Sequence, residues 1–156
     1  MRRELADAVS TLGLDERDEA LIGRNATIIV ESLPHLVKDF YAHQVALDRT
    51  GLFHRSDLSR LEALQAAHWT RLFTGERGEA YVAAVTRIGV VHRERGITPK
   101  LYMQSYGWFA SRLMAEIVAH SGLAEADRAP LAAAVLRVIF LDMSLALASY
   151  EAALLD

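Results

Sequence analysis

Imidazole is the main candidate metal ligand in this sequence, which has six histidines and no cysteine. His92 stands out because Val85, Ile88 and Gly89 precede it by seven, four and three residues and share its face on a helix. A glycine inside a helix costs roughly 1 kcal/mol relative to alanine, so Gly89 needs a packing reason, such as a flat ligand lying beside the imidazole. Neutral imidazole binds iron, and one histidine can hold haem. A buried histidine bonded to a carbonyl group explains the same residues, and their chemistry alone does not decide between the two.

The segments that must position this histidine are predicted to be almost entirely helical. Alanine and leucine dominate, both strong helix formers, and only three prolines and nine glycines interrupt them. Residues 48–57 are rich in turn formers and predict an irregular connection. The expected helices cover residues 2–10, from Asp15 or Asp18 to Leu33, from Pro34 to about Val45, from Ser56 or Asp57 to Thr74, 79–95, 99–121, and from about Glu125 to the C-terminus.

The segment after His92 predicts how its helix ends. Gly96 can adopt the left-handed conformation, and Ile97 can fold back as the hydrophobic contact of the turn. Thr98 then caps the next helix, with Pro99 in its first position.

Composition limits the class of protein. With 156 residues, 52% of them hydrophobic and 24% charged, the chain predicts one all-α globular domain over residues 1–156. Seventeen basic against twenty acidic residues, a net charge of −3 and no basic tract argue against binding nucleic acid. Every long apolar stretch contains a charge and no signal peptide is visible, so we expect no membrane span. The lack of cysteine is compatible with a cytoplasmic location.

Three segments together carry a resemblance to a known family. The stretch Ile88–Met103, followed by Tyr106, resembles the proximal-histidine signature of globin-coupled oxygen sensors, in which a histidine precedes a short turn, Pro-Lys and then a tyrosine. Phe40-Tyr41 resembles the distal tyrosine motif of that family, and Leu61–Gly75 resembles its distal helix. The resemblance covers essentially the whole chain. It implies a globin fold, a three-over-three helical sandwich, with an extra N-terminal lead-in helix.

The resemblance also implies a cofactor and roles for individual residues. The cofactor would be haem b, iron protoporphyrin IX, with His92 as the axial iron ligand. Tyr41 matches the tyrosine that donates a hydrogen bond to bound oxygen, although a core tyrosine tied to a backbone carbonyl is the alternative. Leu64 would exclude water on the distal side, and Tyr102 matches a proximal tyrosine that can hydrogen-bond near His92. The other expected haem contacts are Ile88, Gly89, Phe40 and Leu61.

The remaining polar candidates have weaker claims. Arg60 occupies the place of the distal histidine of many globins and could meet a haem propionate. His68 shares a stripe with Leu61, Leu64 and Leu72 and is expected near the haem edge, with only a minor claim to be a ligand. The other histidines are expected to face solvent: His35, His43, His54 and His120.

The expected function is a haem sensor globin domain that reversibly binds O2, and also CO and NO, without enzymatic activity. The last two helices are apolar on more than one side, which predicts burial on more than one side. In the resembled family these helices pair in a homodimer; a monomer with a generous core is the alternative. Other hypotheses are a globin-like signalling or scaffold module without haem, and a stand-alone globin with nitric oxide dioxygenase or peroxidase activity. The chain could be a stand-alone sensor or the sensor part of a longer protein.

Overall fold

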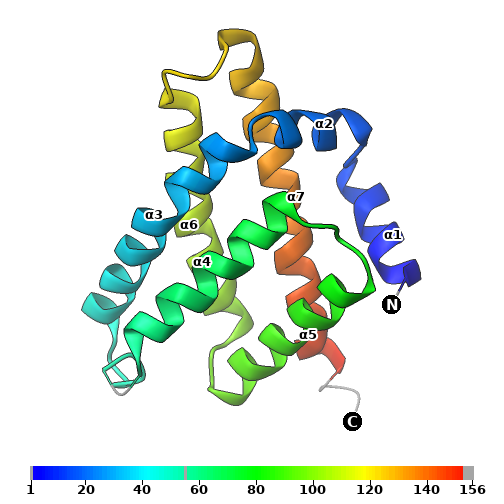
Figure 1. The fold of residues 1–156 in the computed structure, drawn as a ribbon. Coiled ribbons are helices and arrows are strands. Elements are labelled where there is room, and N and C mark those ends of the chain that lie inside the picture. Colours follow the sequence, from blue (N-terminus) through cyan, green and yellow to red (C-terminus); the bar gives the residue numbers. More distant parts are fainter. Residues whose placement is uncertain (1, 55, 153–156) are drawn as a thin grey trace.

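The structure is a computed structural model and describes residues 2–54 and 56–152. These residues form helices joined by turns and contain no strand, which confirms the predicted all-α class (Figure 1). The helices are α1 (Arg2–Leu12), α2 (Glu16–Arg24), α3 (Ala26–Leu47), α4 (Leu58–Thr74), α5 (Glu79–Glu94), α6 (Pro99–Ala119) and α7 (Glu125–Ala152).

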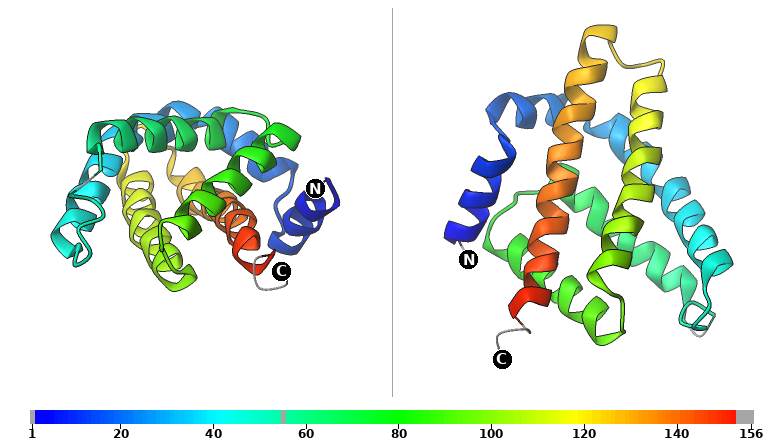
Figure 2. Two further views of the ribbon diagram at one scale, coloured as in Figure 1. Left: turned by 90° about the horizontal axis from the view of Figure 1, so that it is seen from below. Right: turned by 180° about the vertical axis from the view of Figure 1, so that it is seen from behind.

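The helices pack as two crossed layers of three, with α2, α4 and α5 in one layer and α3, α6 and α7 in the other. Helices α6 and α7 run side by side, and α1 lies along α7 as the additional N-terminal helix (Figure 2). Helix α5 packs closely along α7, whereas its backbone scarcely approaches that of α4. Helices α4 and α5, expected on opposite sides of a ligand, therefore pack on different neighbours, α4 mainly on α3 and α5 on α7.

Predicted capping residues begin several of the helices. Asp15 caps α2 by accepting hydrogen bonds from the backbone N–H groups of Arg17 and Asp18, and the side chain of Asp18 accepts from the backbone of Asp15 in return. Asp57 caps α4, and Thr98 caps α6 with Pro99 in the first turn.

The predicted boundary at Pro34 is wrong. Pro34 lies inside α3, which starts at Ala26, and the real break is at Asn25. The side-chain amide of Asn25 donates to the Leu21 carbonyl, and its backbone N–H donates to Ile22, so this one residue terminates α2. Proline in a helix interior removes one backbone hydrogen-bond donor. This loss is tolerated in α3 because Pro34 is on the exposed side of the helix.

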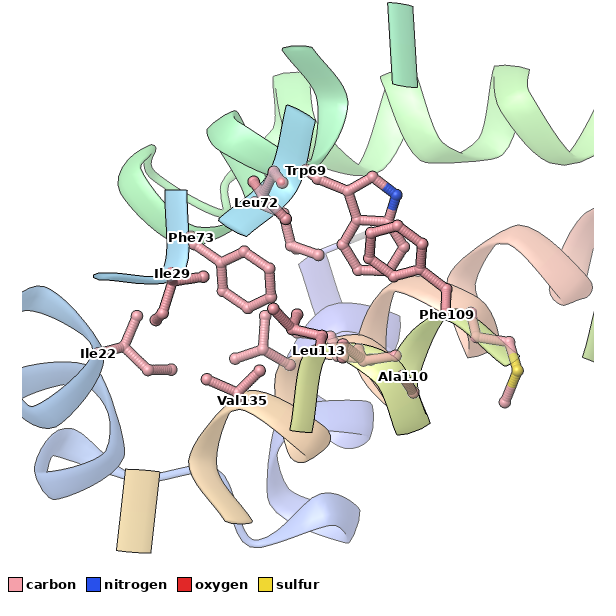
Figure 3. Close-up of a cluster of buried hydrophobic side chains, with 14 of the residues drawn as sticks. Ile22, Ile29, Trp69, Leu72, Phe73, Phe109, Ala110, Leu113 and Val135 are labelled. Carbon is pink, nitrogen blue, oxygen red and sulfur yellow. The ribbon is translucent and has the colours of Figure 1, made fainter. Parts of the chain in front are cut away.

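A continuous apolar core fixes α4 against α6 and α7. The rings of Trp69 and Phe109 stack with centroids 4.5 Å apart, and Leu72, Leu113 and Val135 are completely buried around them (Figure 3). Stacked aromatic pairs of this kind add about 0.5–1.5 kcal/mol beyond the area they bury. These core contacts thus fix the position of α4 next to the candidate site.

Helix α7 is long and apolar enough to cross a membrane by length and composition alone, with a mean hydropathy of 2.0 over its most apolar window. The sequence expectation of no span rested on the charges in each stretch and did not single this helix out. In the fold, 56% of that window is buried against the rest of the protein. Such burial is usual for the central helix of a globular domain, which is apolar on most sides.

Candidate functional site

The turn after α5 places His92 in the last turn of that helix. Gly96 has a φ of 78°, in the left-handed region that glycine adopts without strain. The backbone N–H of Ile97 donates to the His92 carbonyl at 3.0 Å, and that of Gly96 donates to Arg93 at 2.9 Å. This pair of bonds is the Schellman motif, so the predicted helix end is confirmed.

His92 is held as a neutral imidazole with one nitrogen free of protein partners. Its Nδ1 lies 2.8 Å from the Ile88 carbonyl oxygen and must carry the proton, because a carbonyl only accepts. Burial lowers the pKa of His92 below its ordinary value, and the neighbouring Arg95 and His68 lower the pKa further. No hydrogen bond from Nε2 to any described residue is present. Nε2 therefore offers a lone pair, as an iron ligand must.

Tyr102 packs on His92 through its ring and not through its hydroxyl. The two rings meet edge to face, with centroids 5.2 Å apart and an interplanar angle of 82°. The Tyr102 hydroxyl instead lies 3.1 Å from the Tyr106 hydroxyl. The expectation that Tyr102 hydrogen-bonds near the histidine is replaced by a ring contact, because Tyr106 takes its hydroxyl.

Gly89 has a packing reason that differs from the one expected. A Cβ atom at this position would lie 2.2 Å from the carbonyl oxygen of Ala146 and 2.4 Å from the Ser149 hydroxyl, both on α7. The missing side chain therefore lets α5 approach α7, a packing reason that needs no flat ligand, and the expected contact of Gly89 with haem stays a prediction. Ile88, four residues before His92, is half-buried.

Tyr41 lies in α3 with its side chain buried and its ring against two phenylalanines. Phe40 and Phe53 meet it edge-on at centroid distances of 5.2 and 6.1 Å. Its hydroxyl makes no hydrogen bond to the described residues, so the alternative of a tyrosine tied to a backbone carbonyl is not what the fold contains. Burial, with a contribution from Glu62, raises the Tyr41 pKa to about 12. Tyr41 is thus a protonated donor at neutral pH.

Helix α4 carries the two leucines expected to contact haem, Leu61 and Leu64. The Leu64 side chain is 57% exposed, although it lies one turn before the partly buried His68, and Leu61 is half-buried. The backbones of α4 and α5 stay apart at this place. The expected contact of Leu64 with haem stays a prediction. Arg60 is exposed, and its backbone N–H donates to the capping side chain of Asp57.

His68 is hydrogen-bonded to a buried acidic residue that the sequence did not single out. Asp142, in α7, is completely buried, and its two carboxylate oxygens lie 3.0 and 2.9 Å from Nε2 of His68. Tyr81 and Tyr106 donate to the same carboxylate at 2.8 and 2.7 Å. The available signal was one acidic residue on the buried stripe of an apolar helix, since a buried acid requires partners.

The prediction that the other four histidines face solvent holds only for His35 and His54. His35 is exposed and pairs with Glu116. His43 is half-buried and stacks on Trp108 with ring centroids 5.0 Å apart. His120 is half-buried at the end of α6, where its Nδ1 accepts from the backbone of Gly122.

Comparison with known proteins places this arrangement in a family. The family model of protoglobin matches residues 1–156. The chain belongs to the protoglobin family. Over 114 residues it is 30% identical to the "Heme-based aerotactic transducer HemAT" of Halobacterium salinarum, a match that covers 71% of this chain and 23% of that protein. The match therefore spans less than a quarter of the length of that relative.

The solved structures confirm the fold. The globin domain of a globin-coupled sensor from Geobacter sulfurreducens superposes with a TM-score of 0.81 at 16% identity, covering 93% of this chain and 96% of that one. The predicted globin fold with an extra N-terminal helix and the resemblance to globin-coupled sensors are thus confirmed. The first of these two proteins is described as a transducer and the second as a sensor.

Proposed function

We propose that this protoglobin domain binds haem b through His92 and senses a diatomic gas at the iron. One observation carries the proposal: His92 has its Nδ1 proton committed to Ile88 and its Nε2 without a partner among the described residues. A carbonyl partner of this kind fixes the tautomer and the ring orientation that an axial ligand needs. The family membership of the chain supports the same cofactor.

The residues around the site fit a haem group in character. Leu64 and Leu61 on α4 and Ile88 on α5 would contact its faces, and Phe40 lies beside Tyr41 as an aromatic neighbour. Apolar walls of this kind keep water from the iron. Leu64 is 57% exposed in the isolated chain, and a bound porphyrin would cover that apolar surface. The Arg60 side chain makes no hydrogen bond or ion pair with a described residue and could pair with a propionate.

Haem, when bound, supplies an iron atom that takes up O2, CO or NO reversibly. Tyr41 would then serve as the donor to the bound gas, since its hydroxyl is protonated and makes no hydrogen bond to a described residue. A hydrogen bond in a buried site is worth about 1–3 kcal/mol when its loss leaves a polar group unpaired. This range corresponds to a change in affinity of roughly five- to 150-fold.

The signal would leave the domain through a homodimer formed by α6 and α7. Val118 on α6 and Leu136 and Phe140 on α7 are exposed to 47, 38 and 46% in the isolated chain. Leu136 and Phe140 are four residues apart and share one face of α7. Large apolar side chains gathered on two adjacent helices support burial in a second copy of the chain.

The decisive experiment is a haemin titration of the purified protein, followed by absorption spectra with and without dithionite and CO. His92→Gly should lose stable haem binding, and added free imidazole should restore a haem spectrum by occupying the vacated position. His54→Gly, at an exposed turn position, is the matched control and should bind haem as the wild type does. A wild-type protein that takes up no haem, or a His92→Gly variant with an unaltered spectrum, would refute the proposal.

A further inference from the structure

Asp142 brings together side chains from three other helices in the interior. Its carboxylate accepts from Tyr81 of α5 and Tyr106 of α6 and contacts His68 of α4. Asp142 is 0% exposed, and a carboxylate without a proton of its own can only accept hydrogen bonds. Every group that faces it must therefore donate, which fixes where the protons of its neighbours point.

This constraint gives the tyrosine pair a direction. Tyr106 has one hydroxyl proton, and its bond of 2.7 Å to the Asp142 carboxylate uses that proton. Its oxygen can then only accept from Tyr102, 3.1 Å away. Tyr102 is consequently the donor in the pair, and its own proton points away from His92. The order of donation runs from Tyr102 to Tyr106 to Asp142.

The same order fixes the ring that lies on His92. With its hydroxyl held by Tyr106, the Tyr102 ring is anchored at both ends, by that bond and by its edge-to-face contact with the imidazole at 5.2 Å. Tyr102 is buried, so no solvent molecule takes the place of Tyr106 at low cost. The imidazole of His92 is in turn held by Ile88 on one side and by the Tyr102 ring on another.

We propose that Asp142 is a positioning residue of the haem site, which acts through Tyr106 and Tyr102 to set the orientation of His92. The proposal rests on the proposed role of His92 as the iron ligand. Asp142 does not contact His92 directly, so α7 would influence the site only through these two tyrosines. A change in the orientation of His92 alters the iron–histidine bond, and outer residues that hold a ligating histidine commonly tune the metal in this way.

Two tyrosines bonded to the same carboxylate allow a matched test. Tyr106→Phe keeps the ring but removes the acceptor of Tyr102, whereas Tyr81→Phe removes a donor to Asp142 and leaves the Tyr102–Tyr106 bond in place. Both variants lose one buried hydrogen bond to Asp142, and Tyr106→Phe also loses the Tyr102–Tyr106 bond, so the difference between them reports that second bond. Asp142→Asn tests the carboxylate itself, and Tyr106→Phe keeps the test valid if that variant does not fold.

The measurement is the iron–histidine stretching band in the resonance Raman spectrum of the ferrous, ligand-free protein. We expect the band to shift in Tyr106→Phe and in Asp142→Asn and to stay at the wild-type position in Tyr81→Phe. An unshifted band in Tyr106→Phe would overturn the proposal. Equal shifts in Tyr106→Phe and Tyr81→Phe would also overturn it, because they would indicate a general loss of packing.

A second readout needs no haem. In the haem-free protein, the NMR shifts of the His92 ring protons report the position of the Tyr102 ring, through its ring current. We expect these shifts to change in Tyr106→Phe and not in Tyr81→Phe, and unchanged shifts in both would contradict the proposal. Failure of the wild type to bind haem would refute the proposed function alone, since this NMR comparison would still decide whether Asp142 and Tyr106 position His92.

Discussion

Gly89 and Ala146 bring the helix of the candidate iron ligand into direct backbone contact with the last helix. A Cβ atom on Gly89 would stand 2.2 Å from the Ala146 carbonyl oxygen, a distance that real Cβ atoms do not reach. One turn further along, Arg93 donates to the Ser149 carbonyl at 2.5 Å, and beyond the helix end Tyr150 donates to Ile97 at 2.9 Å. The segment around His92 is therefore fixed to the C-terminal part of α7.

Gly89→Ala should destabilise the protein, because the new methyl group meets a backbone carbonyl that cannot move without shifting α7. Overpacking of this kind costs typically about 1–3 kcal/mol. The free energy of unfolding from urea titrations, followed by circular dichroism on the haem-free protein, measures the effect.

Gly107→Ala is the matched control, since Gly107 lies within α6 and a Cβ there meets nothing within 4 Å. It should leave the stability unchanged or raise it by about 0.4–1 kcal/mol, the usual gain from replacing an unconstrained glycine. Equal stabilities for the Gly89 and Gly107 variants would contradict the close packing of α5 on α7.

Tyr41→Phe should speed the dissociation of O2 by roughly fivefold or more, which corresponds to the loss of about 1 kcal/mol. Bound O2 carries partial negative charge and accepts from a hydroxyl, whereas CO carries less. The CO dissociation rate should therefore change less than the O2 rate in the same variant. Flash photolysis and stopped-flow mixing supply both rates, and an O2 off-rate equal to that of the wild type would remove Tyr41 from this role.

Local sequence signals predicted most of the fold near the site. The turn from Gly96 to Pro99 needs only backbone conformation and capping chemistry, both encoded within four residues, and it forms as expected. The helix start predicted at Pro34 was wrong because proline is favoured at helix starts, whereas in the fold tertiary packing keeps α3 continuous on both sides of Pro34. The competing signal, Asn25 as a terminator, is weaker in sequence than a proline.

Sequence motifs single out His92 and Tyr41 as candidates but do not reveal which residues surround them. Gly89 was recognised as needing a reason, but which helix it faces depends on residues nearly sixty positions away. The partners of Asp142 come from three helices, and no spacing along the chain reports that they meet. Long-range contacts of this kind follow from the assembled layers, whereas sequence periodicity reports only which face is buried.

Alkaline pH should unfold the protein through its tyrosines. Burial raises the pKa of Tyr41 to about 12, and the pKa values of Tyr81, Tyr102, Tyr106 and Tyr150 are also raised above the ordinary value. An unfolded chain loses these protons near pH 10, while the folded chain keeps them. The stability that these tyrosines contribute is thus fully present below pH 10 and falls as the pH rises further, by roughly 1.4 kcal/mol per pH unit for each of the four deeply buried ones, Tyr41, Tyr81, Tyr102 and Tyr106.

Tyrosinate absorbance and circular dichroism, recorded together against pH, check this expectation on the haem-free protein. Ionisation should coincide with loss of helical signal, and the same chain in concentrated guanidinium should titrate near pH 10. Ionisation of all the tyrosines near pH 10 with the helices intact would show that burial does not protect them.

Phe140→Glu should convert a dimer into a monomer without unfolding the domain. The Phe140 side chain is 46% exposed in the single chain, so a charge there is tolerated by the fold but is costly inside an apolar interface. Light scattering coupled to size exclusion should give twice the chain mass of 17.3 kDa for the wild type and 17.3 kDa for the variant. Leu47→Glu is the control, because Leu47 is 61% exposed at the end of α3, outside α6 and α7, and its dimer should persist. A wild-type mass of one chain at all concentrations would contradict the proposed interface, as would a Phe140→Glu protein that remains dimeric.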